Sequence, residues 1–187
     1  MQNPRDLKVL PLAASRRGRP PLGFGLEVAD GVAVEVPEAE NEPLVRCTER
    51  AGGRVIGVLE IDIFAASLIM DPDGAITELA AGVLERLRAG GTARSQPPLG
   101  FDRDDDVHGV RVHADLLRDR DGQRPALPYV TVVALAGSSV RGSVVITMRS
   151  AADHWDAGER MLESVQVLDR DRGGGRGGRL AMPMTGR

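Results

Sequence analysis

Apolar and polar residues alternate over several short runs of the chain, which is the pattern of half-buried β-strands. The first run places Val32, Val34 and Val36 on one face, and Pro37 ends it because proline cannot donate to a strand ladder. The apolar density of 54–65 indicates a strand that is buried on both faces. We therefore expect strands at 31–37, 44–49, 54–65 and 107–117, and a hairpin over 129–148 around a Gly-Ser-Ser turn.

The period changes after Asp71-Pro72-Asp73-Gly74, which carries the capping and proline signals of a helix start. Apolar residues then recur at the three- and four-residue spacing of one helical stripe. Gly90-Gly91 follows the stripe and predicts the helix end. The stripe consists of Ile76, Leu79, Ala80, Val83, Leu84 and Leu87.

A second helix is predicted from Ser150 to about Glu163. Ser150 is its expected N-cap, with Asp153 in the capping-box position. In this helix the side chains expected to face the core are Trp155, Met161 and Leu162.

The segments between these elements are polar. Residues 92–106 are expected to form a surface loop with room for a short strand, and 119–128 a charged loop. The resulting order is β-β-β-α-β-β-β-α-β. It predicts an α+β fold in which an antiparallel sheet is flanked by a helix on each side.

Composition and charge divide the chain into three parts. Its 187 residues are 42% apolar, which suits one folded domain at 23–168. Residues 1–22 form an expected flexible arm with five basic residues against one acidic residue. Residues 169–187 form an expected flexible Gly/Arg tail with five arginines against two aspartates and an apolar end.

The charge layout bears on partners. Residues 23–168 carry 14 basic and 24 acidic residues, so nucleic-acid binding by the folded domain is not expected. The basic ends have two open interpretations. They can contact nucleic acid or an acidic protein surface, or they can fold back over the acidic body.

The sequence is typical of a cytoplasmic protein. No apolar run approaches the roughly 20 residues that span a bilayer. The apolar patch at 9–14 is broken by Pro11 and followed by arginines, which is not the order of a secretory signal. The single cysteine, Cys47, permits no internal disulfide and is expected to be a small buried apolar residue.

Several features together resemble the PsbP-like fold family. They are the opening strand VAVEVP at 32–37, the helix after DPDG, the long central hairpin, the short second helix and the closing ESVQVL at 163–168. This family includes photosystem II extrinsic subunits, a Ran-binding nuclear transport factor and bacterial lipoproteins. The resemblance implies an α/β/α sandwich and a non-enzymatic accessory or binding protein without a transferable active site. Glu38 to Glu42 replace the aromatic residue that often follows the first proline in the family.

Candidate metal sites do not meet their requirements. Asp71-x-Asp73-Gly74 begins like a calcium loop, but Gly82 stands where that loop needs its twelfth ligand. The acidic segment 102–106 lies near His108 and His113, which point to opposite faces of a strand because they are five residues apart. A solvated loop is the favoured interpretation, and we predict no metal site.

Candidate catalytic residues are equally isolated. Ser138-Ser139 lies in a hairpin turn, without the strand–turn–helix context of a nucleophilic serine. His154 precedes Trp155 and is interpreted as a partly exposed helix residue. We therefore predict no catalytic residue and no cofactor, and we do not expect an enzyme.

The tail offers a candidate partner-binding peptide. A Gly/Arg tether leads to three apolar side chains that can become ordered on binding, namely Leu180, Met182 and Met184. The sequence thus predicts an accessory or adaptor protein that binds a protein partner or larger assembly. The alternative is a carrier of a small apolar ligand, held between the sheet and a helix.

Overall fold

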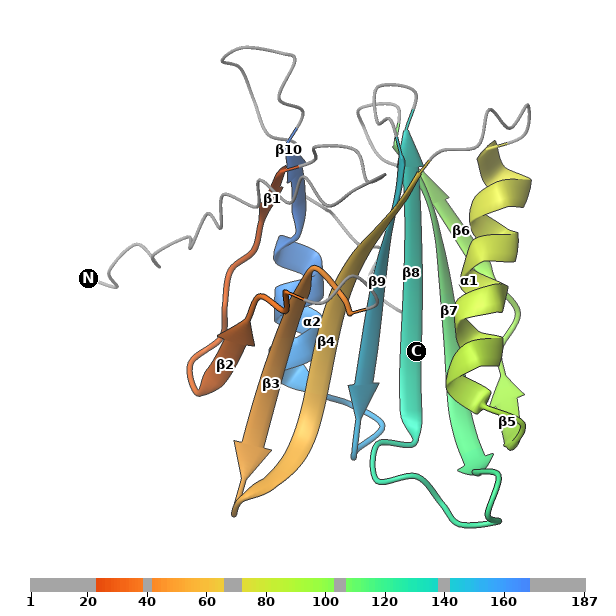
Figure 1. Cartoon of the computed structure of the whole chain (residues 1–187). Helices are drawn as coiled ribbons and strands as arrows, with labels where there is room; N and C mark the ends of the chain where they lie inside the picture. Colours follow the sequence, from red (N-terminus) through yellow and green to blue (C-terminus); the bar gives the residue numbers. More distant parts are fainter. Residues whose placement is uncertain (1–22, 39–41, 66–71, 103–106, 138–141, 169–187) are drawn as a thin grey trace.

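The computed structural model describes residues 23–38, 42–65, 72–102, 107–137 and 142–168. These residues form a mostly antiparallel sheet structure with two helices, so the fold is α+β (Figure 1). The strands of the main sheet are β2 (Val32–Glu35), β3 (Val45–Ala51), β4 (Arg54–Ala65), β5 (Thr92–Ser95), β6 (Leu99–Asp102), β7 (Val107–Arg118), β8 (Tyr129–Gly137) and β9 (Gly142–Ser150). The remaining elements are β1 (Gly23–Gly25), α1 (Pro72–Arg88), α2 (Asp156–Ser164) and β10 (Gln166–Leu168).

Within the described residues the main sheet runs in the order β2-β3-β4-β9-β8-β7-β5, and β6 also pairs with β7. Each neighbouring pair is antiparallel. β9 returns from β8 and lies between β8 and β4, which joins the first three strands to the later ones. The closing strand β10 pairs with β1 in a separate two-stranded ribbon, so the predicted final strand exists but is not part of the main sheet.

The two helices pack on opposite faces of this sheet. This follows from β8, in which alternate residues belong to different core clusters. Val132 of β8 packs in the cluster with α1, whereas Val133 packs in the cluster with α2. The α1 cluster contains Ile76, Ala80, Val83, Val110, Val112, Ala114, Leu116, Val130, Val132, Ala134 and Val145. The α2 cluster includes Cys47, Leu59, Ile61, Ile63, Leu135, Ile146, Met148, Trp155, Met161 and Leu162.

The first predicted helix is confirmed. Ile76, Ala80 and Val83 of the stripe are buried, and the helix ends where Ala89 and Gly90 take positive φ values of 47° and 83°. A glycine tolerates this left-handed backbone without a steric penalty, so Gly90 provides the helix stop that the sequence indicates.

The second helix begins later than predicted. Ser150 is the last residue of β9 and pairs with Gly57 and Tyr129, so the sheet ladder takes the residue expected to cap a helix. The Ser150 hydroxyl donates to the carbonyl of Ala152 at 2.7 Å, and the N-cap of α2 is Trp155. The predicted core side chains Trp155, Met161 and Leu162 are nevertheless buried, as expected.

Two strand predictions also needed correction. Residues 92–106, expected to be mainly a loop, contain both β5 and β6, which extend the sheet beyond β7. Val36 lies after the end of β2 and is 49% exposed, so it does not share the partly buried positions of Val32 and Val34. β2 is an edge strand of only four residues, so Val36 lies beyond its paired residues and its side chain is left exposed.

The single tryptophan of the chain, Trp155, fixes α2 to the sheet. Its indole N–H donates to the carboxylate of Glu49 on β3. A Cβ atom on Gly57 or on Gly158 would overlap the indole ring, so both positions need glycine for the ring to fit between β4 and α2. Trp155 is 6% exposed and therefore reports on the helix–sheet contact.

Candidate interaction face

The sheet face that carries α1 is covered by this helix over β7 and β8 only (Figure 1). Glu35, Arg46 and Glu60 are cross-strand neighbours on β2, β3 and β4. The same row continues through Thr147 to Val132, which lies under α1. Directly opposite residues of an antiparallel pair point to the same side, so these charged residues share a face with the α1 core. No helix among the described residues packs over them.

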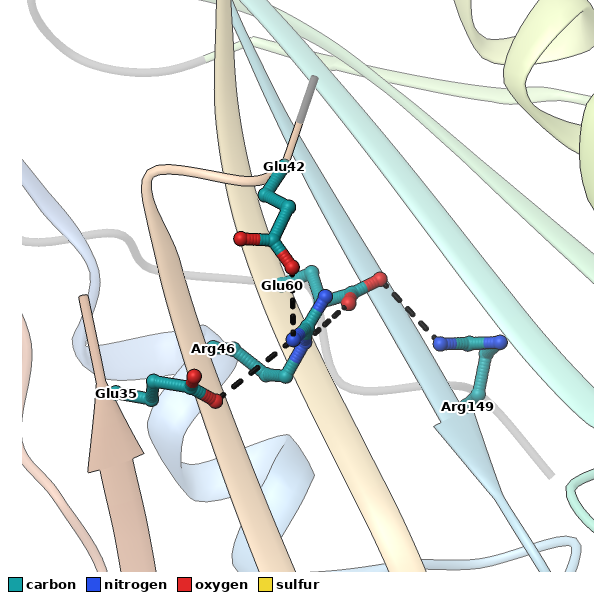
Figure 2. Close-up of polar contacts among 5 residues, drawn as sticks. All are labelled: Glu35, Glu42, Arg46, Glu60 and Arg149. Atoms are coloured by element: carbon teal, nitrogen blue, oxygen red, sulfur yellow. Dashed lines mark hydrogen bonds and ion pairs between the residues drawn. The ribbon is translucent and has the colours of Figure 1, made fainter. Parts of the chain in front are cut away.

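We call this region the charged half-face and define it by Glu35, Glu42, Arg46, Glu60 and Arg149 (Figure 2). Arg46 is at its centre. Arg46 Nε donates to Glu60 Oε1 at 2.8 Å, and Arg46 Nη1 lies 3.7 Å from Glu35 Oε2 and 3.9 Å from Glu42 Oε1. Arg149 Nη2 reaches the other oxygen of Glu60 at 3.4 Å.

Exposure divides these residues into an inner and an outer group. The side chains of Glu60 and Arg46 are 18% and 28% exposed, whereas those of Glu42 and Glu35 are 41% and 64% exposed. The inner pair is held by a charge-assisted hydrogen bond of short length, which is stronger than an exposed ion pair. The outer carboxylates therefore present negative charge to solvent around a fixed centre.

The electrostatics of the half-face follow from this arrangement. The hydrogen bond from Arg46 to Glu60 raises the pKa of Arg46, and the charges of Glu60, Glu35 and Glu42 raise it further against the opposing effect of burial. Three carboxylates face two guanidinium groups. Asp62 adds a fourth carboxylate on the same face, since it pairs with Val145 of the α1 core. Among the described residues, this surface is thus mixed in sign and carries more carboxylates than guanidinium groups.

A second polar region lies on the α2 face, beyond the edge of that helix. Arg111 of β7 is 9% exposed, and its Nη2 donates to both carboxylate oxygens of Glu159 on α2 at 2.8 and 2.9 Å. Two residues further along β7, His113 Nδ1 lies 3.0 Å from the hydroxyl of Thr131, its cross-strand neighbour on β8. The Arg111–Glu159 contact fixes the edge of α2 to β7, and the His113–Thr131 contact links β7 to β8.

Burial and the charge of Arg111 lower the pKa of His113, and the charges of Glu159 and Asp153 partly oppose this effect. A half-buried neutral imidazole that is hydrogen-bonded to a hydroxyl is a normal polar group at the edge of a core, because its hydrogen-bonding requirement is met. Within the described residues, no group of three or more His, Cys, Asp or Glu side chains has the arrangement of a metal site.

The structure places the other predicted candidates apart from each other. His108 and His113 lie on opposite faces of β7, as the spacing predicts. The interpretation of His154 as a helix residue was wrong, because it precedes the N-cap of α2; its side chain is 74% exposed and lies 2.8 Å from Asp156. Burial raises the pKa of the Cys47 thiol to about 11, which agrees with its interpretation as a buried apolar residue.

Several predicted features lie outside the described residues. They are Asp71, the aspartates at 104–106, Ser138-Ser139 and the tail residues Leu180, Met182 and Met184.

The charged half-face was missed from the sequence, although β4 carries a signal for it. Residues 54–65 were expected to be buried on both faces, but Glu60 and Asp62 alternate with the buried Leu59, Ile61 and Ile63. This is the period-two pattern of a strand with one polar face. Placing Arg46 beside Glu60 required the β3–β4 register, which composition does not supply.

No helix within the described ranges is long and apolar enough to cross a membrane. Comparison with models of known protein families gives no match, and comparison with curated protein sequences gives none either.

Proposed function

We propose that this protein is a non-enzymatic accessory or adaptor module, and that its charged half-face binds a protein partner. The proposal rests on the sheet face that carries α1. This face is apolar under the helix and carries a fixed array of charged side chains where the helix does not cover it. A positioned set of charges of both signs gives orientation and specificity to a complex, which suits recognition of a folded or extended protein surface.

The polar contacts of the half-face support binding over catalysis. Glu60 is engaged by two guanidinium groups, and Arg46 is surrounded by carboxylates, so each inner group is committed to an ion pair. A nucleophile or general base would instead need a hydrogen-bonded neighbour that orients it for proton transfer. The array is thus better suited to docking than to a reaction.

The PsbP-like resemblance is part of the same proposal. An antiparallel sheet with a helix on each face agrees with the arrangement that the resemblance implies, and accessory binding is the function that goes with it. The tail residues Leu180, Met182 and Met184 are proposed as a second, apolar contact with the partner. The carrier alternative has less support, because the contact between α2 and the sheet is filled by side chains such as Ile146, Met161 and Leu162, each 0% exposed.

The proposal is tested by affinity purification of full-length protein from its native host, followed by quantitative mass spectrometry. Wild type is compared with the double variant E35Q/E42Q, which removes the two outer carboxylates and leaves the Arg46–Glu60 pair in place. E78Q/E85Q is the matched control, because these two glutamates are exposed on α1, away from the half-face.

A partner that is enriched with wild type and with E78Q/E85Q, and reduced with E35Q/E42Q, would support recognition through the half-face. Equal recovery with all three proteins would contradict it. A further form that ends at Leu168 tests the tail: partner loss from that form alone assigns recognition to residues 169–187 rather than to the folded domain.

A further inference from the structure

The charged half-face has a candidate ligand within the same chain. Its acidic excess lies on a body in which acidic residues outnumber basic ones by 24 to 14. The C-terminal segment has the complementary composition, with arginines at 170, 172, 176 and 179 separated largely by glycine. Guanidinium groups pair with carboxylates through charge-assisted hydrogen bonds, and in the half-face itself Glu60 receives one such contact from Arg46 and one from Arg149 (Figure 2).

The position of the chain end allows this contact. The last described residue, Leu168, pairs with Gly23 in the β1–β10 ribbon. Figure 1 places this ribbon toward β2, β3 and β4, at the side of the sheet away from α1. Adjacent strands are about 4.8 Å apart, so Glu35 on β2 and Glu60 on β4 are separated by about two such spacings.

The segment can extend well beyond the β1–β10 ribbon. Nine residues connect Leu168 to Gly177, and an extended chain spans about 3.3 Å per residue, or roughly 30 Å in total. To reach the charged half-face the chain has to pass the edge strand β2, because β10 directly follows α2, which packs on the other face of the sheet. Attachment also keeps the arginines near the carboxylates at an effective concentration on the order of millimolar, so individually weak contacts add up.

We propose that the arginines of residues 170–179 bind the outer carboxylates of the charged half-face and cover it until a partner displaces them. The inference rests on the proposed function, since it gives that same surface an internal competitor. It also specifies the chemistry of the partner, which must offer basic groups of its own to replace the tail. The outer carboxylates Glu35 and Glu42 are the groups that either ligand would contact.

The test uses the full chain with a spin label at an introduced cysteine, Gly177→Cys. Cys47 is buried and burial raises its thiol pKa to about 11, so labelling at neutral pH is directed to the new cysteine. Paramagnetic loss of NMR amide intensity is then measured at Arg46, Thr48 and Glu60. The amides of Val112 and Ala114, under α1, serve as the internal reference.

We expect selective loss of intensity at the half-face amides in low salt. It should be relieved in E35Q/E42Q, retained in E78Q/E85Q, and relieved when Arg172, Arg176 and Arg179 are changed to glutamine. High salt should relieve it as well, because exposed charges are screened over about 10 Å at 0.1 M. As a control, spin-labelled protein is mixed with isotope-labelled protein that carries no spin label. No loss of amide intensity is expected in this mixture, which assigns the contact to a single molecule.

Three results would overturn the inference: no loss of intensity, loss spread evenly over the reference amides, or loss that persists in E35Q/E42Q. None of these requires a partner, so the inference can fail while partner recovery through the half-face still holds. Conversely, tail contact without partner recovery would remove the proposed function and leave only the internal contact.

Discussion

At the scale of single residues, glycine has opposite roles at two helical positions. Gly158 on α2 lies against Trp155 and Met148, where an added Cβ would overlap both side chains. Gly82 on α1 is exposed and has no atom near the place of its missing Cβ. Helix propensity favours alanine at both positions by about 1 kcal/mol, so packing alone separates them.

The matched pair Gly158→Ala and Gly82→Ala tests this difference. We expect G158A to lower the free energy of unfolding by about 1–3 kcal/mol because the tightly packed indole has to move. G82A should raise it by about 0.5–1 kcal/mol. Urea denaturation followed by Trp155 fluorescence measures both changes, and equal stability of the two variants would contradict the packing described around Trp155.

His113 provides a prediction about pH. Burial and Arg111 lower its pKa in the folded protein, with Glu159 and Asp153 acting in the opposite direction. The unfolded chain therefore binds a proton at higher pH than the folded protein does. The stability associated with a neutral His113 is complete above the unfolded pKa of about 6.5 and is lost as pH falls through the folded value.

We expect the free energy of unfolding of wild type to decrease between pH 6.5 and pH 5 more steeply than that of His113→Gln. Glutamine keeps a polar group beside Thr131 but does not titrate. Chemical denaturation at several pH values gives the two slopes. Parallel slopes would show that His113 is not the group responsible.

At the scale of elements, the sequence predicts most of the fold. The stripe from Ile76 to Leu87 and the alternation of β7 are local periodic signals, and the structure confirms both elements. Ser150 shows where local signals fail, because a serine suited to cap a helix is retained by β9 through pairing with Gly57. Strand pairing connects distant residues, and no window of sequence contains that information.

The candidate site was less predictable for the same reason. Arg46 and Glu60 are ordinary charged residues of two separate strands until the β3–β4 register places them directly opposite each other. The alternation of Glu60 and Asp62 with apolar residues could have shown that β4 has one polar face. It could not have shown that α1 leaves this part of the face uncovered.

The cross-strand pair between β3 and β4 leads to a quantitative prediction. A double-mutant cycle with Arg46→Gln and Glu60→Gln should give a coupling energy of about 1 kcal/mol, since the pair is partly buried and hydrogen-bonded. The control cycle uses Glu85 and Arg88 on α1, whose side chains are 62% and 41% exposed. Its coupling should be about 0.3 kcal/mol.

Unfolding by urea measures both cycles. A coupling at Arg46–Glu60 no larger than that of the α1 control would mean that the centre of the charged half-face is not held in place. The outer carboxylates would then lack the fixed framework that the proposed binding surface requires.

At the scale of the whole molecule, the two helices cover different parts of the sheet. α1 covers β7 and β8 on one face, and α2 packs over β4 on the other. The result is a sheet with a sealed apolar core on each side and a charged half-face beside α1. The Trp155 contact and the Arg111–Glu159 pair hold α2 against the sheet face opposite to the charged half-face.

We propose that this half-face is the surface on which a partner binds. The most direct measurement is carboxyl-group footprinting of the full-length protein with and without the partner recovered by affinity purification. Modification of Glu35 and Glu42 should fall in the complex, while that of Glu78 and Glu85 on α1 stays unchanged. Unchanged modification of Glu35 and Glu42 in the complex would contradict the claim and place the binding surface elsewhere on the molecule.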